Sequence, residues 1–173
     1  QYQGRGGEWA RLVAEIVPDF CAADDAPIPG REEQYTLVMG YRVDLARQQE
    51  RNLGRAAVLQ AKRVAWDRQQ AAIALALPPD APLDDVQRNR IRTLSVSVFT
   101  LGQILMEQGS AGCVAAYEEA IRYDRHTQNT ADEAIGHYNL GRAWGEMPAI
   151  RDLDAAEAAY RRSLDLFDPD DAL

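Results

Sequence analysis

Hydrophobic residues recur every three to four positions over most of the chain, which is the spacing of one face of a helix. The first such stripe lies in residues 8–17 and consists of Trp9, Leu12, Val13 and Ile16. Longer stripes follow over residues 31–50, 52–77, 84–109, 111–125, 131–147 and 152–167. No segment sustains the two-residue alternation of a half-buried strand. The pattern therefore predicts an all-α protein of about seven helices that pack as antiparallel neighbours.

Proline, glycine and short polar side chains predict where these helices begin and end. Pro18 is predicted to end the first helix, and the loop of residues 21–30 follows it. A second break, rich in proline and aspartate, covers residues 78–84. Asn52 and Asp84 stand just before helical stripes and are predicted to cap them.

Two glycines stand in the middle of helical stripes, each directly after a leucine. They are Gly102 and Gly141. A glycine inside a helix costs about 1 kcal/mol relative to alanine, so a packing reason is expected. Two helices approach closely only where a side chain is missing, and we predict that each glycine forms a notch faced by a small residue, Cys113 or Ala156.

The residues around these glycines form a frame that occurs twice. The first copy is Val98, Leu101, Gly102 and Leu105, then Cys113 and Tyr117; the second is His137, Leu140, Gly141 and Trp144, then Ala156 and Tyr160, with Pro169 after it. This frame resembles the signature of the tetratricopeptide repeat (TPR), W-x2-L-G-x2-Y followed by A-x3-F and a proline. The resemblance covers residues 95–169, with a spacing longer than the family's usual period of about 34 residues.

The resemblance implies an architecture of antiparallel helix hairpins stacked as a right-handed α-solenoid. It divides the chain into an N-terminal helix and loop (1–30), a degenerate helix hairpin (31–80) and two TPR-like repeats within residues 84–173. The repeats themselves would cover residues 95–125 and 134–169.

In the family, the first helix of each hairpin lines a concave, partner-binding face. The positions carried over from that pattern are Phe99, Thr100, Gln103 and Met106 in the first repeat and Tyr138, Asn139, Arg142 and Glu146 in the second. For Phe99 and Tyr138 the alternative is packing between neighbouring repeats. Polar residues such as Asn139 and Arg142 have no packing reason to face inward, which favours a binding role for them.

Charge and composition narrow the class of partner. The chain of 173 residues has a formal net charge of -8, which disfavours binding to nucleic acid or to an anionic membrane surface. No apolar run approaches the roughly 18 residues that span a bilayer. The abundance of alanine, leucine, aspartate and arginine suggests a bacterial origin. Cys21 and Cys113 lie far apart and are predicted to be reduced, buried thiols of a cytoplasmic protein.

Catalytic and metal-binding patterns are missing from the sequence. His126 and His137 are not at the spacing of metal ligands and are predicted to lie in a turn and in half-buried packing. The paired aspartates at 24–25 and 84–85 and the acidic run 168–171 are interpreted as solvated loop and cap positions. We therefore expect no enzyme activity, no metal and no cofactor.

These observations predict a non-catalytic helical-repeat module with a scaffolding or regulatory role. Its partner would be a protein or peptide segment, either of a separate molecule or of another domain of the same chain. The chain begins without a methionine and ends just after a helical stripe, which suggests a fragment of a larger bacterial signalling protein. Two alternatives stay open: a small-ligand or peptide-sensing domain linked to an ATPase or protease, and a structural oligomerisation unit.

Overall fold

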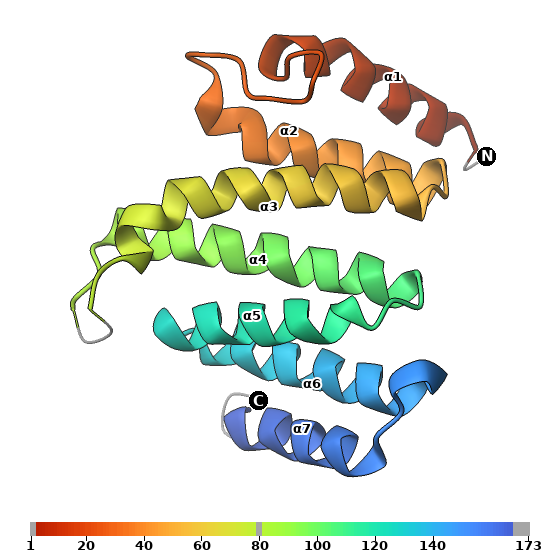
Figure 1. The fold of residues 1–173 in the computed structure, drawn as a ribbon. Coiled ribbons are helices and arrows are strands. Elements are labelled where there is room, and N and C mark those ends of the chain that lie inside the picture. The colour runs from red at the N-terminus through yellow and green to blue at the C-terminus, as the bar shows by residue number, and fades with distance from the viewer. Residues whose placement is uncertain (1–2, 79–80, 168–173) are drawn as a thin grey trace. The chain divides into compact units, whose positions relative to one another are not determined.

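The computed structural model describes residues 3–78 and 81–167, and this part of the chain is helical, without a strand. The α-helices are α1 (Gln3–Phe20), α2 (Glu32–Asp44), α3 (Leu53–Leu75), α4 (Asp85–Glu107), α5 (Gly112–His126), α6 (Thr130–Glu146) and α7 (Leu153–Leu166). A π-helical turn, η1 (Leu45–Gln49), continues α2, and a 3₁₀ turn, η2 (Pro148–Ile150), precedes α7 (Figure 1). The predicted all-α class with seven helices is confirmed.

Two local features differ from the sequence prediction. The first helix begins earlier than expected and continues through Pro18 to Phe20, because a proline removes one backbone donor and often kinks a helix without ending it. The second stripe does not form one continuous α-helix. It widens into η1, where the amide of Glu50 donates to the carbonyl of Leu45 over 3.0 Å.

The two predicted helix caps are confirmed. Oδ1 of Asn52 accepts a hydrogen bond from the amide of Arg55 at 2.9 Å. Asp84 and Gln87 form a reciprocal capping box, with bonds of 2.7 and 2.9 Å between each side chain and the other residue's amide. Each cap satisfies amides that have no partner within the helix.

The chain divides into two compact units, Gln1–Trp66 and Asp67–Leu173, and the division falls within α3. In the N-terminal unit, α1 packs on α2, and Trp9 meets Tyr41 edge to face with ring centroids 5.1 Å apart. Tyr35 of α2 contacts Trp66 in the same manner at 5.4 Å. Val38, Met39 and Val43 of α2 are also buried.

Asp25 organises the loop between α1 and α2, although the sequence suggested a solvated carboxylate. Its backbone is left-handed, with φ of 67°, a conformation that aspartate tolerates. Its carboxylate lies 2.6 Å from Arg42 and 2.7 Å from Lys62, and its carbonyl accepts a bond from the hydroxyl of Tyr35. Burial opposes ionisation, but the bonds from Lys62 and Arg42 outweigh it and lower the pKa of Asp25. The chain's single lysine therefore has a structural role.

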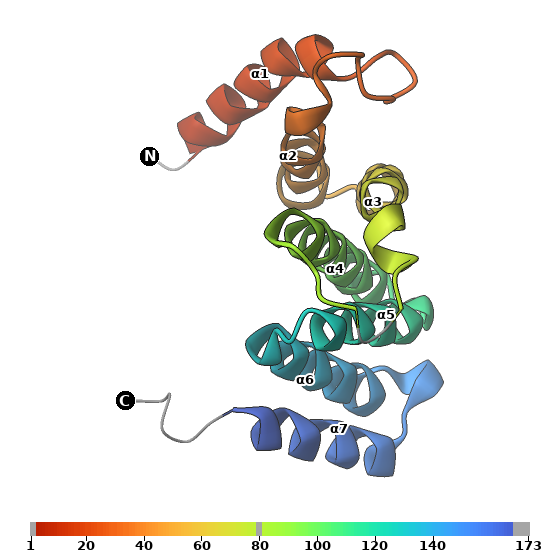
Figure 2. The same ribbon diagram turned by 90° about the vertical axis from the view of Figure 1, so that its left-hand side faces the viewer.

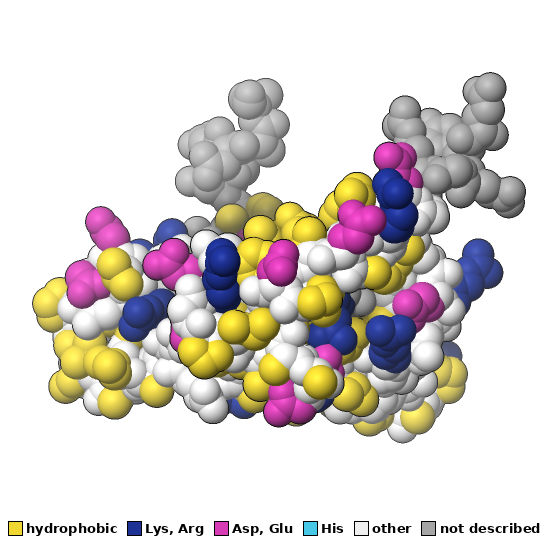
Figure 3. Space-filling model, turned by 90° about the horizontal axis from the view of Figure 1, so that it is seen from above, with side chains coloured by type: hydrophobic (Ala, Val, Ile, Leu, Met, Phe, Trp, Pro, Cys, Tyr) yellow, Lys and Arg dark blue, Asp and Glu magenta, His cyan; other side chains and the backbone are white. Residues whose placement is uncertain are grey.

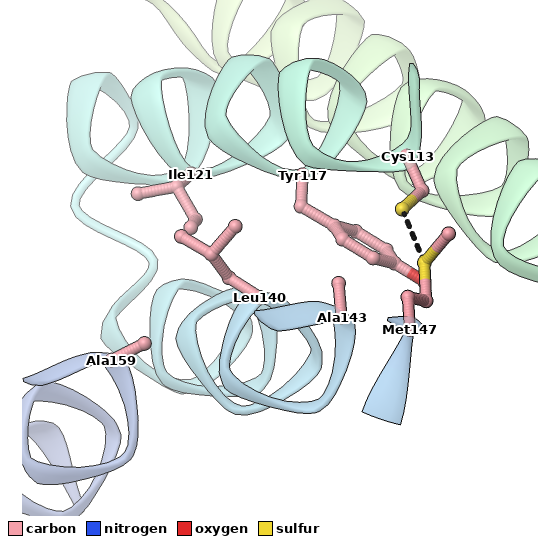
Figure 4. Close-up of a cluster of buried hydrophobic side chains, with 7 residues drawn as sticks. All are labelled: Cys113, Tyr117, Ile121, Leu140, Ala143, Met147 and Ala159. Atoms are coloured by element: carbon pink, nitrogen blue, oxygen red, sulfur yellow. Dashed lines mark hydrogen bonds between the residues drawn. The ribbon is translucent and has the colours of Figure 1, made fainter. Parts of the chain in front are cut away.

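In the C-terminal unit, consecutive helices pack against one another from α4 to α7 (Figures 1 and 2). The core between α5 and α6 contains Tyr117 and Ile121, which point toward Leu140 and Ala143 (Figure 4). The thiol of Cys113 lies 3.4 Å from the sulfur of Met147 in the same core. Both Cys113 and Cys21 are free and buried, as predicted.

The glycine notches are present, but the residues that fill them differ from the prediction. A Cβ atom on Gly102 would lie 2.7 Å from the ring of Tyr117, and one on Gly141 would lie 2.9 Å from the ring of Tyr160. The three atoms nearest to each added Cβ all belong to that tyrosine, not to Cys113 or Ala156. A tyrosine ring fits because its flat face occupies the space left by the missing side chain.

One buried serine joins the two helices of each hairpin, and the bonded positions are equivalent in the two hairpins. Ser95 of α4 lies with its hydroxyl 3.1 Å from the carbonyl of Ala120 on α5. In the next hairpin the direction is reversed: Ser163 of α7 donates over 2.8 Å to the carbonyl of Ala134 on α6. Pro169, the predicted end of the second repeat, and the acidic run 168–171 lie outside the described residues.

Candidate functional site

Helices α4 and α6 expose apolar side chains at equivalent positions. Val96 lies six residues before Gly102, and Ile135 lies six residues before Gly141. Their exposed fractions are 49% and 42%, and Tyr138, one turn after Ile135, is 50% exposed. Large apolar side chains that stand together on a surface mark sites of interaction more often than isolated ones do.

The two aromatic residues of this surface, Phe99 and Tyr138, each pack against the tyrosine that fills the glycine notch of the same hairpin. The Phe99 and Tyr117 ring centroids are 5.5 Å apart, and those of Tyr138 and Tyr160 are 5.7 Å apart, with tilted planes in both cases. Each of these ring contacts lies within one hairpin, but Phe99 also packs against the core cluster that includes Leu140 and Ala143 of α6, which agrees with the alternative of packing between hairpins. Phe99 is half-buried, whereas Tyr138 is exposed.

Among the polar residues predicted to face a groove, Asn139 departs from the expectation. It is 8% exposed, and its amide donates to the carbonyl of Ile135 in its own helix over 2.9 Å. Arg142 is accessible and pairs with Glu146 at 3.1 Å, and this bond raises the pKa of the guanidinium. Any partner group that bonded Arg142 would have to compete with Glu146 for it.

The remaining predicted positions lie on α4. Thr100 and Gln103 are half-buried, and the hydroxyl of Thr100 donates to the carbonyl of Val96 over 2.8 Å. Met106 is also half-buried, and its sulfur lies 3.7 Å from the hydroxyl of Tyr117. Their roles in partner binding stay predictions.

A pocket of about 130 Å³ opens beside the apolar surface. Its wall is formed by Ser95, Val96 and Phe99 of α4, Asp124 of α5, and Asp132 and Ile135 of α6. Three helices therefore contribute to it, and all belong to the C-terminal unit. The pocket combines apolar walls with two carboxylates and one hydroxyl.

Asp124 is the unusual group in this pocket. Only 3% of the residue is exposed, and Oδ1 accepts a 2.6 Å hydrogen bond from the hydroxyl of Ser95. Its second oxygen, Oδ2, has no hydrogen-bond partner among the described residues. Burial raises the pKa of Asp124 to about 6, because the bond from Ser95 and the charge of Arg92 compensate only in part for lost hydration.

Asp132 lies nearer the surface, at the start of α6. Its amide donates to Oδ1 of Asn129, and its carboxylate accepts a bond from the side-chain amide of Asn129. This reciprocal pair holds Asp132 at the N-terminus of the helix, where a negative charge is favourable. No ion pair joins Asp132 to a basic residue within the described part of the chain.

The histidines do not form a metal site in the described residues, where no group of three or more potential ligands is found. Burial lowers the pKa of His137, whose Nε2 lies 3.8 Å from Glu133. Glu133 also pairs with Arg125 at 2.9 Å and lies 3.7 Å from Arg162, so it links α5, α6 and α7.

The charged side chains are mixed on the face that Figure 3 shows. Basic side chains there are separated by acidic and hydrophobic ones, and the described residues on that face form no continuous basic surface. None of the helices in the described ranges is both long enough and apolar enough to cross a membrane.

Sequence reasoning considered each helix separately and missed five of the six residues that line the pocket, all except Phe99. Val96 and Ile135 carried a signal, because each stands one turn before an aromatic residue of the predicted face. Ser95, Asp124 and Asp132 carried none, since only the packing of three helices brings them together.

A scan against protein-family models finds no match for this chain. Searches of curated proteins and of solved structures likewise find no match.

Proposed function

We propose that α4 to α7 form two TPR-like repeats of an α-solenoid, and that the segment is a non-catalytic module that binds a partner peptide. The proposal is supported by the equivalence of the two hairpins. Each has a glycine filled by a tyrosine ring, an aromatic residue resting on that tyrosine, and a serine bond between its helices.

The observation that carries the binding role is the exposed apolar surface of α4 and α6. Val96, Ile135 and Tyr138 are each about half exposed, and Val96 and Ile135 line the same pocket, so these side chains lie together. The rings of Phe99 and Tyr138 pack against a buried and a half-buried tyrosine, so little side-chain freedom would be lost on binding. An extended or helical segment of another protein, or of the same chain, is the occupant that suits such a surface.

The test compares two substitutions of the same chemical type. The labelled chain is applied to an array of unrelated short peptides, together with the variants Ile135→Glu and Leu164→Glu. Ile135 lies on the proposed surface, whereas Leu164 is a 71% exposed leucine of α7. Ile135→Glu should reduce retention on the peptides that the unmodified chain binds by about tenfold or more, since it buries a charge in an apolar contact.

Leu164→Glu should keep the retention of the unmodified chain. The proposed surface would be refuted by equal loss in the two variants. A chain that binds none of the peptides would refute the module's peptide-binding role.

A further inference from the structure

We propose that the pocket between α4 and α6 receives an arginine side chain of the bound peptide, with Asp124 and Asp132 as its counter-charges. This inference rests on the proposed function and names the chemistry that the partner must have. It is carried by the pocket's size, by its lining and by the unfilled bonding capacity of a buried carboxylate.

The size of the pocket suits the end of one side chain. A cavity of about 150 Å³ holds a six-membered ring, and this pocket has a volume of about 130 Å³. The planar head of an arginine fits that space, with its methylene stem along an apolar wall. Val96, Phe99 and Ile135 supply the wall.

The polar lining calls for a donor with positive charge. Asp124 and Asp132 contribute two carboxylates to the pocket, and no basic side chain lines it. Ser95 supplies only one hydrogen bond to Asp124, and Oδ2 is left without a partner among the described residues. A guanidinium has five donors in a planar fork and can bond both oxygens of one carboxylate.

An arginine is favoured over a small free amine by continuity with the apolar surface. Val96 and Ile135 belong both to the pocket wall and to the exposed surface that also holds Tyr138. A peptide that lies on this surface therefore passes over the mouth of the pocket. A free amine would use the carboxylates and leave the exposed apolar side chains uncovered.

The electrostatic surroundings of Asp124 support the same conclusion. Arg92 acts from α4 to favour its ionised form, whereas Asp132 and Glu133 of α6 act against it, and burial is the largest effect. The result is a pKa of about 6, so the carboxylate is mostly ionised at pH 7 and takes up a proton just below neutral pH. A bound cation would stabilise the ionised form.

The experiment uses two pools of short peptides with the same randomised flanks. One pool has arginine at the centre, and the other has citrulline, its uncharged isostere. The 173-residue chain should retain the arginine pool about tenfold more than the citrulline pool in physiological salt, which is the effect of one charge-assisted hydrogen bond. The preference should weaken as the pH falls below about 6, where Asp124 takes up a proton.

Three variants separate the pocket from the overall charge of the chain. Asp124→Asn and Asp132→Asn should each remove most of the preference for arginine. Asp165→Asn makes the same change in net charge at an exposed position of α7 and should keep the preference. Circular dichroism checks that each variant is folded, and Asp124→Asn should not lower the melting temperature.

Each other outcome overturns the inference. Equal retention of the two pools would refute the arginine pocket while leaving peptide binding intact. The same loss in Asp165→Asn as in Asp124→Asn would assign the preference to net charge alone. Displacement of the peptides by arginine amide at a similar concentration would identify the occupant as a small amine. Failure of both pools to bind would instead refute the proposed function.

Discussion

Replacing a notch glycine by alanine separates two opposing effects on stability. Alanine favours a helix over glycine by about 1 kcal/mol. At Gly102, however, the new methyl group would lie 2.7 and 2.8 Å from two ring carbons of Tyr117. Carbon atoms prefer separations of about 3.5–4.0 Å, so the helices or the ring would have to move.

Tyr117 has no room to move. It is completely buried, its ring contacts Phe99, and its hydroxyl lies 3.7 Å from the sulfur of Met106. Overpacking of a rigid site typically costs about 1–3 kcal/mol. Contacts as short as 2.7 Å place the cost in the upper part of that range, about 2–3 kcal/mol, so after the gain of about 1 kcal/mol in helix propensity Gly102→Ala should destabilise the protein by about 1–2 kcal/mol.

Gly145 provides the matched control. A methyl group there would lie 3.8 Å from Cβ of Ala156, an ordinary van der Waals distance. Gly145→Ala should therefore stabilise the protein by up to about 1 kcal/mol. Gly141→Ala should be destabilising, but less so than Gly102→Ala, because Tyr160 is only half-buried and can yield.

Urea denaturation followed by circular dichroism measures all three variants. Gly102→Ala should lower the free energy of unfolding, whereas Gly145→Ala should raise it. If Gly102→Ala were as stable as the unmodified chain, the tyrosine ring would not be the reason for the glycine. Equal gains in Gly102→Ala and Gly145→Ala would show that helix propensity alone decides the outcome.

Three further predictions concern hydrogen bonds and charges. Asp124→Asn should stabilise the protein at pH 7 by about 3 kcal/mol, because the folded pKa of about 6 lies about two units above the unfolded value of 3.8. This gain is nearly full above pH 6 and disappears below 3.8, which melting temperatures measured across that pH range will show. Asp25→Asn should destabilise by about 1–2 kcal/mol at pH 7, since it weakens the bond to Lys62, and its difference from the unmodified chain should shrink as acid protonates Asp25. Ser163→Ala should cost about 1 kcal/mol in chemical denaturation, through loss of the bond to Ala134.

The helices could be predicted from the sequence because their stripes are long and their ends carry local signals. Asn52 and Asp84 cap helices where the sequence placed them, since a cap depends only on residues within one turn. Pro18 was misjudged because a missing amide can be tolerated within a helix. The π-helical turn at 45–49 had no signal, since it depends on how α2 meets its neighbours.

The notch glycines show where sequence reasoning stops. The need for a close approach at Gly102 followed from the helical penalty alone, but the opposing residue depends on the angle and offset of two helices. Those are set by packing, and they bring Tyr117 rather than Cys113 against the glycine. Asn139 illustrates the same limit: helical spacing gives a direction around one helix but not what lies beside it.

A comparison of three carboxylates in this chain explains why Asp124 stands apart. Burial opposes the charge at Asp25, Glu119 and Asp124 alike. Two basic side chains compensate for it at Asp25, and Arg68 together with a tyrosine hydroxyl does so at Glu119, so both pKa values are lowered. Asp124 is the most deeply buried of the three, and among the described residues only a hydrogen bond from Ser95 and the charge of Arg92 act against burial, so its pKa is raised. Asp25 and Glu119 each accept a hydrogen bond from a basic side chain of the protein, whereas Asp124 accepts none in the described part of the chain. Because Asp124 lines a pocket, a ligand can supply that basic group.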